Sequence, residues 1–170
     1  MHTNESTLSG KITTRYLTRA AVIAALYVAL TYLAGIMNLA YGPVQFRFSE
    51  ALTVLPFLFP EAVPGLFVGC IISNLISPYG VLDLVVGSAA TLLAAIWTNR
   101  SRSRWFAPMP PVIANAVMVG ARIAWYEAGF GAGFPAAFAY NALTVGLGEL
   151  VVCYALGLPL LKLLENRGVK

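Results

Sequence analysis

The sequence is poor in charge and in the residues that perform chemistry in water. Only 11% of its 170 residues are charged, and the single histidine, His2, lies in the polar N-terminal stretch. Neither a Gly-x-x-x-x-Gly-Lys-Ser/Thr phosphate loop nor a His-Glu-x-x-His motif occurs, and these are patterns that bind ATP phosphates or a catalytic zinc ion. So little charge leaves no room for a sizeable water-soluble domain, and we expect no metal, no cofactor and no enzymatic activity.

Cysteine is also scarce. The two cysteines, Cys70 and Cys153, both lie inside apolar runs. A cysteine in an apolar run usually behaves as a small buried hydrophobic residue. We therefore interpret both as core residues rather than as a disulfide pair or metal ligands.

Long apolar runs make up most of the chain, since 59% of its residues are hydrophobic. Lipid offers the backbone no hydrogen-bond partners, so long apolar runs indicate transmembrane helices. Hydropathy predicts six segments, at residues 17–37, 46–59, 61–77, 81–98, 111–126 and 135–164. The second and third are short and predict either tilted helices or a re-entrant pair. We therefore predict an all-α integral membrane protein, with one six-helix domain over residues 17–164 between polar tails at residues 1–16 and 165–170.

The basic residues predict the orientation in the bilayer. Nine of the eleven lie before the first segment, between the fourth and fifth, or at the end of the chain: Lys11, Arg15, Arg19, Arg100, Arg102, Arg104, Lys162, Arg167 and Lys170. Six spans would place all nine on one side, which the positive-inside rule makes cytoplasmic, together with both termini. The run from Arg100 to Arg104 could also contact anionic lipid or nucleic acid. We interpret it as a plain orienting loop, with no nucleic acid as partner.

With that topology, the remaining polar side chains gather in the outer half of the bundle. They are Arg47, Glu50, Asn74, Asp83, Arg122, Glu127, Asn141 and Glu149, whereas the inner half has only Glu61 and Asn115. Several have a simpler interpretation: Glu50, Asp83 and Glu61 as first-turn acids, Arg47 with Glu50 as a neutralising pair, and Asn115 as an interhelical hydrogen bond. The asymmetry predicts an outer binding site and argues against a self-sufficient channel or carrier, whose polar row would cross the whole membrane.

Glu149 is the strongest candidate for binding. It lies in the middle of the last apolar segment, where an acid costs about 2.5–3.5 kcal/mol on insertion scales. Gly146 and Gly148 beside it permit close approach of a ligand or another backbone. Asn141 lies roughly 80° around the same helix, so both can face one cavity. The alternative for Glu149 is an ion pair with Arg122.

The first segment carries a ladder of small residues, Ala21, Ala25 and Ala29, with Ala20 and Ala24 beside it. Small residues at this spacing let another helix pack closely within lipid. The ladder predicts either internal packing or a docking face for a partner subunit.

Two long runs resemble a known family. They are YGPVQFRFSEALTVLPFLFPEAVPGLFVGCIISNLISPYGVLDLVVGS at residues 41–88 and VGLGELVVCYALGLPL at residues 145–160. Both are similar to the QueT family, the substrate-binding S components of energy-coupling-factor (ECF) transporters assigned to queuosine precursors. The resemblance implies a six-helix S component in the plasma membrane of a prokaryote, with its substrate bound near the outer face. It also implies a T component and two cytoplasmic ATPases as partners, with the alanine ladder facing the T component.

A deazaguanine ligand, as the resemblance implies, fits these residues chemically. Its adjacent N–H donors suit the carboxylate of Glu149 or Glu50, and its carbonyl suits the amide of Asn141 or Asn74. Asp83 is a second acid for an aminomethyl cation, and Arg47 completes the polar set. Four aromatic residues can stack on the ring: Tyr41, Phe48, Tyr79 and Trp125.

Four other functions remain open. They are an S component for another vitamin, a self-sufficient membrane carrier, an intramembrane enzyme and a structural helix-packing protein. The lack of core histidine and lysine argues against the enzyme.

Overall fold

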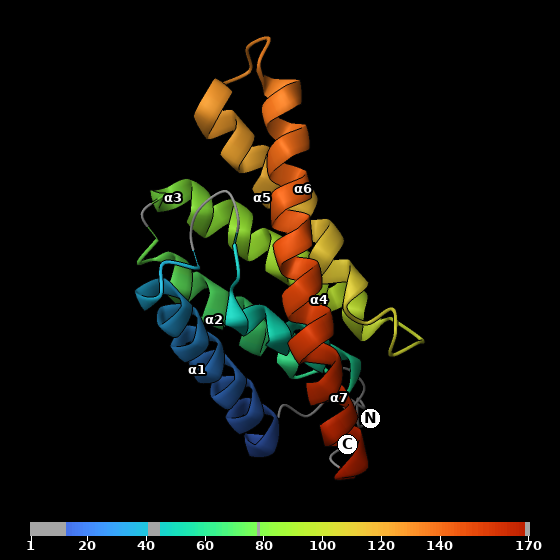
Figure 1. Ribbon diagram of the computed structural model, residues 1–170. Helices are drawn as coiled ribbons and strands as arrows, with labels where there is room; N and C mark the ends of the chain where they lie inside the picture. The colour runs from blue at the N-terminus through green and yellow to red at the C-terminus, as the bar shows by residue number, and fades with distance from the viewer. Residues whose placement is uncertain (1–12, 41–44, 78, 169–170) are drawn as a thin grey trace, which may run out of the picture.

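A computed structural model describes residues 13–40, 45–77 and 79–168, and every regular element in them is helical (Figure 1). Six helical segments follow one another, as predicted. Two of them are continuous helices that contain a π-helical turn. The elements are α1 (Thr14–Ile36), η1 (Phe48–Phe57), α2 (Ala62–Asn74), α3 (Gly80–Leu82), η2 (Asp83–Gly87), α4 (Ser88–Asn99), α5 (Met109–Ala128), α6 (Phe134–Val152), η3 (Cys153–Gly157) and α7 (Leu158–Asn166).

Three helices are long and apolar enough to cross a membrane: Thr14–Ile36, Gly80–Asn99 and Phe134–Asn166. They correspond to the first, fourth and sixth predicted segments, so the all-helical membrane fold is confirmed. The start of α1 and the end of α7 lie at the same end of the bundle, at the bottom of Figure 1. The side of the membrane that this end faces stays a prediction.

The second segment, for which we predict a tilted helix or one arm of a re-entrant pair, is helical but not α-helical. It forms η1, a 3₁₀ helix of 10 residues that is buried from Ser49 through Pro56. A 3₁₀ helix rises about 2.0 Å per residue, so η1 is roughly 20 Å long and shorter than a bilayer core. It packs against α1, α4 and η3. Because these helices enclose η1, the side chain of Glu50 is buried within the bundle.

Small residues bring α1 and α2 together. A Cβ on Gly65 or Gly69 would lie 2.6 or 2.9 Å from the carbonyl oxygens of Ala20 and Ala24, respectively, so these glycines allow close backbone contact. The alanine ladder itself, Ala21, Ala25 and Ala29, is exposed. Of the two alternatives for the ladder, internal packing does not hold within the described residues, because the neighbouring stripe with Ala20 and Ala24 makes that contact.

The second close pair is α5 with α6, which form a hairpin at the top of Figure 1. Gly120 of α5 lies against Ala142 of α6, where a Cβ would meet the backbone at 2.8 Å. The two π-helical turns begin at Asp83 and Cys153. Such turns occur frequently at functional sites, and both of these adjoin the polar residues described next.

Candidate functional site

Two buried carboxylates from different helices share their neighbours, and we call Glu50 and Glu149 the acid pair. Glu50 on η1 is 1% exposed and Glu149 on α6 is 4% exposed. The hydroxyl of Tyr27 donates to Oε1 of Glu50, and Nδ2 of Asn115 lies 3.5 Å from Oε2. Asn115 also hydrogen-bonds the side chain of Glu149. The thiol of Cys153 lies 3.7 Å from Glu149 Oε2 and 3.5 Å from the carbonyl oxygen of Glu50.

A second group contains two arginines around one aspartate, and we call Arg47, Asp83 and Arg122 the arginine–aspartate triad. Nη2 of Arg47 lies 3.5 Å from Asp83 Oδ2, and Nη2 of Arg122 lies 3.3 Å from Oδ1. Asp83 is fully buried and also accepts a hydrogen bond from Ser77. Charge-assisted N–H···O bonds are usually about 2.7–2.9 Å long, so both ion pairs are loose.

Arg122 is the least satisfied member of the triad. Its Nε and Nη2 atoms are buried and have no hydrogen-bond acceptor within the described ranges. Its guanidinium lies 4.6 Å from the ring centroid of Tyr79, at cation–π distance. Nearby, Asn74 donates to the carbonyl oxygen of Asp83, while its own Oδ1 accepts nothing from the residues described. Buried polar atoms normally have partners, so these donors and this acceptor are suited to a polar ligand.

Arg47 joins the two groups into one buried polar cluster. It stands in extended backbone immediately before η1, and its Nε donates to the carbonyl oxygen of Ala40 at 2.9 Å. Besides Asp83, it interacts electrostatically with both Glu50 and Glu149. The cluster thus draws side chains from α1, η1, η2, α5 and α6, around the point where the chain enters the bundle centre.

Gly148 fixes that entry point. A Cβ at this position would overlap the carbonyl oxygen of Gln45, so only glycine lets the segment before η1 lie against α6 beside Glu149. The sequence predicts that Gly146 and Gly148 permit a close approach. At Gly148 the approaching group is the chain's own backbone, whereas Gly146 faces the side chain of Ala116.

Comparison with known protein families identifies the family of this chain. The QueT transporter family, represented by its sequence model, matches residues 17–166. The chain belongs to the QueT transporter family. A curated relative, the queuosine precursor transporter QueT of Lactococcus lactis subsp. cremoris (strain MG1363), is 41% identical over 73 residues. That match spans 43% of this chain and 43% of the relative, and no solved structure matches the chain.

Within this QueT-family fold, the predicted site residues do not all meet. Glu149, Glu50, Arg47, Asp83, Asn74 and Tyr79 lie in or beside the buried polar cluster. Asn141 instead donates to Glu127 of α5 at 2.8 Å. Trp125 packs on Phe130, and Phe48 is half-buried. Tyr41 lies outside the described residues.

Three expected local pairings differ in the structure. Arg122 pairs with Asp83 rather than with Glu149, so the ion-pair alternative for Glu149 is wrong. Arg47 pairs with Asp83, because it precedes η1 in extended backbone and does not share a helix face with Glu50. Glu61 is more than a first-turn acid, since its Oε1 lies 2.7 Å from Nη1 of Arg19 at the far end of the bundle.

Sequence reasoning missed Tyr27 and underrated Asn115. Tyr27 is fully buried in α1, and its hydroxyl contacts Glu50. Its signal in the sequence was a hydroxyl group in the middle of an apolar segment, where it needs a partner. Asn115 does bond across helices as interpreted, but its partners are the acid pair. In the described part of the chain, no three His, Cys, Asp or Glu side chains are grouped for a metal ion.

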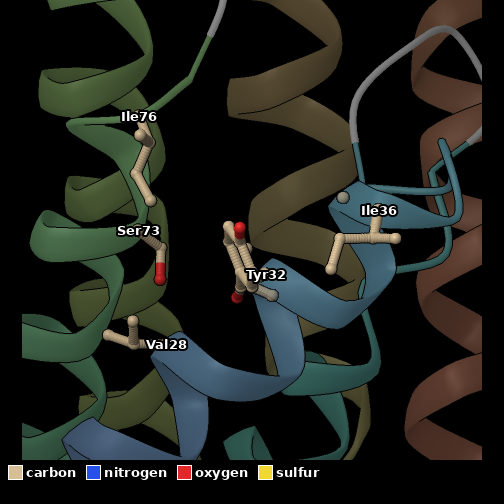
Figure 2. A pocket seen from close by; sticks show the side chains of 7 residues that line it. Val28, Tyr32, Ile36, Ser73 and Ile76 are labelled. Atoms are coloured by element: carbon tan, nitrogen blue, oxygen red, sulfur yellow. The ribbon is translucent and has the colours of Figure 1, made fainter.

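A separate pocket lies between α1 and α2, with a volume of about 280 Å³ (Figure 2). Figure 2 shows Val28, Tyr32 and Ile36 of α1 near Ser73 and Ile76 at the end of α2. Thr31 also lines the pocket and donates to Ser49, the residue before Glu50. None of the described residues that line this pocket is charged. It suits an apolar group rather than a polar ring with several hydrogen-bond donors.

Proposed function

We propose that this chain is the substrate-binding S component of an ECF importer and binds a queuosine precursor of the 7-deazaguanine type. Three observations support the proposal: the family match over residues 17–166, the similarity to a bacterial queuosine precursor transporter, and the buried polar cluster. The acid pair gives the proposal its strongest support. Its two carboxylates come from separate helices, are buried, and have Asn115 as a shared neighbour.

The cluster's atoms match a deazaguanine by donor and acceptor. A carboxylate of the acid pair accepts the adjacent N–H donors on the ring edge, as acids do when they read bases. The unsatisfied Nε and Nη2 of Arg122 donate to the ring carbonyl, and Oδ1 of Asn74 accepts a further N–H. Tyr79, which lies over the Arg122 guanidinium, is placed to contact the ring face.

The topology in this proposal has both termini in the cytoplasm of a prokaryotic cell. The start of α1, the α4–α5 loop and α7 carry the described basic residues other than Arg47 and Arg122, and these segments lie toward the lower part of Figure 1. The positive-inside rule makes that end cytoplasmic. Arg47, at the start of η1, and Asp83, near the start of the fourth segment, then lie in the outer half. A substrate would therefore bind from outside.

Transport then requires partners, which we propose are a T component and two ATPases. The exposed ladder of Ala21, Ala25 and Ala29 is a stripe of small residues on α1 that no other described element covers. In lipid, such a stripe favours close packing of a foreign helix. The chain lacks a phosphate loop, so ATP hydrolysis would occur on another subunit.

The test is calorimetric titration of the purified protein with 7-aminomethyl-7-deazaguanine, with riboflavin and thiamin as controls. We expect saturable binding of the deazaguanine alone. The matched variants are Glu149→Gln, which should weaken binding, and Glu165→Gln on the same continuous helix, which should not, because Glu165 pairs with Arg104 at 3.7 Å near the end of α7. A folded protein that binds a control vitamin and no deazaguanine would refute the assignment.

A further inference from the structure

The charges of the buried polar cluster do not cancel. Five ionisable side chains in it are each at most 5% exposed. The acids are Glu50, Asp83 and Glu149, and the bases are Arg47 and Arg122. With all five ionised, three negative and two positive charges leave one uncompensated negative charge inside the bundle. Uncompensated buried charge is strongly disfavoured, so the cluster needs one more positive charge from another source.

The imbalance is located at the acid pair. The arginine–aspartate triad already contains two positive charges for one negative charge, and its ion pairs engage Asp83 from both sides. The acid pair therefore holds two carboxylates whose nearest described cation is Arg47. Two like charges that share a low-dielectric site do not both ionise readily.

The other elements packed around the acid pair supply no cation. From α1 comes the hydroxyl of Tyr27, from α5 the amide of Asn115, and from η3 the thiol of Cys153. Within η1, Thr53 lies 3.7 Å from the same thiol, and α2 contributes Cys70, which interacts electrostatically with Glu50. All of these groups are neutral or acidic. Since no described residue other than Arg47 brings a positive charge to the acid pair, a proton or a ligand is left as the source of the missing charge.

We infer that the acid pair holds one proton in the ligand-free protein, and that it exchanges this proton for the cation of a ligand bearing a primary ammonium group. The inference rests on the proposed function and names the substrate class within it. The carboxylic acid loses its proton to solvent while the ligand's –CH₂NH₃⁺ group takes its place, so net charge at the site is unchanged. A deazaguanine with a neutral nitrile cannot make this exchange and leaves the proton where it is.

The exchange predicts the direction of proton transfer on binding and of the change in affinity with pH, and both can be measured. A primary amine has a pKa near that of lysine, about 10, so the ligand is already protonated at neutral pH. Binding then releases about one proton from the protein, and affinity rises with pH by up to about tenfold per unit while the pair holds its proton. The nitrile form should show neither effect.

The experiment is titration calorimetry of the full chain in two buffers of different ionisation enthalpy, with the aminomethyl and nitrile 7-deazaguanines as probes. We expect about one proton released for the aminomethyl form and about none for the nitrile. Equal proton release for both ligands would overturn the inference while leaving the proposed function in place. Binding of neither ligand would overturn both.

Two variants distinguish the effect of losing one acidic charge from the effect of losing the folded structure. Glu149→Gln and Glu50→Gln each leave two acids and two bases, so the empty cluster becomes neutral without a proton. Each should lose proton release and lose affinity for the aminomethyl form by at least tenfold more than for the nitrile form. Retained nitrile binding shows that the variant is folded. Unchanged proton release in both variants would contradict the role of the acid pair.

Discussion

The two ends of this bundle contain ion pairs of opposite character. Near the start of α1, Arg19 and Glu61 make one pair at 2.7 Å, and the guanidinium of Arg19 also lies over the ring of Phe59. At the other end, Asp83 meets Arg47 and Arg122 at 3.5 and 3.3 Å, and Arg122 keeps two donors without acceptors in the described part of the chain. Arg19 and Glu61 hydrogen-bond each other, whereas the triad has buried donors that lack an acceptor among the described residues.

The surroundings of the two ends differ in the same way. The Arg19–Glu61 pair lies beside an apolar core that includes Leu52, Leu55 and Leu66. The buried polar cluster instead places five charged side chains within the bundle. Polar groups inside a membrane protein are costly and usually serve a function. A contact that only joins helices needs one satisfied pair, so the unsatisfied end is the better candidate for a ligand.

The largest expected effect comes from removing one charge at the unsatisfied end. Glu50→Gln should weaken binding of the aminomethyl precursor by roughly 10–100-fold, because hydrogen bonds to a charged group are worth about 1.5–3 kcal/mol. Titration calorimetry measures it, with Glu61→Gln at the other end as control. Equal losses in both variants would remove the distinction between the two ends.

A smaller effect is expected where the backbone closes over the cluster. Gly148→Ala places a Cβ against the carbonyl of Gln45, and overpacking of this kind costs about 1–3 kcal/mol. We expect about tenfold weaker binding and a lower melting temperature. Gly133→Ala is the matched control, since its Cβ would meet only an ordinary contact at 3.6 Å. Unchanged binding in Gly148→Ala would show that this segment need not lie against α6.

The exposed side of α1 should respond differently from its buried side. Ala25→Leu enlarges the alanine ladder and should reduce recovery of a complex with the T component several-fold, because the close helix approach is lost. Ligand affinity should not change. Co-purification from membranes gives the readout, and Ala139→Leu, at another exposed alanine on α6, is the control. Loss of ligand binding in Ala25→Leu would contradict a pure docking role.

The smallest effect concerns the satisfied pair. Glu61 lies outside the helices; burial raises its pKa, but the hydrogen bond and charge of Arg19 outweigh this and hold the pKa below its ordinary value of 4.5. A lowered pKa in the folded protein means that the pair stabilises above pH 4.5 and that the gain is lost as the pH falls through the lowered pKa. Glu61→Gln should cost about 1 kcal/mol or less at neutral pH.

Melting temperatures of wild type and Glu61→Gln, measured from pH 7 downward in the same detergent, check this sign. The difference should shrink below pH 4.5. A difference that grows as the pH falls would mean that Glu61 is stabilised in its protonated form.

The sequence predicts the segments of this fold well and their pairings poorly. Apolar runs and basic clusters mark where each helix begins and ends, and an acid in mid-helix marks Glu149. Nothing in a hydropathy pattern distinguishes a 3₁₀ helix from a short α-helix, so η1 was not foreseen. Tertiary packing, rather than local preference, selects its geometry, because it is enclosed by α1, α4 and η3.

The partners of charged residues are equally hidden from sequence. Arg122 could be expected beside Glu149 or Asp83, and only the placement of η2 against α5 decides for Asp83. On α1, two alanine stripes differ by one position, which is about 100° around a helix. The glycines of α2 select Ala20 and Ala24 and leave the ladder at Ala21, Ala25 and Ala29 exposed.

The most direct test of the central claim is an experimental structure of the protein with bound 7-aminomethyl-7-deazaguanine. We predict that the ligand lies between η1 and α6, with its ammonium group at the acid pair and its ring carbonyl accepting a hydrogen bond from Arg122. A ligand bound instead in the pocket between α1 and α2, lined by Thr31 and Ser73 (Figure 2), would contradict this prediction.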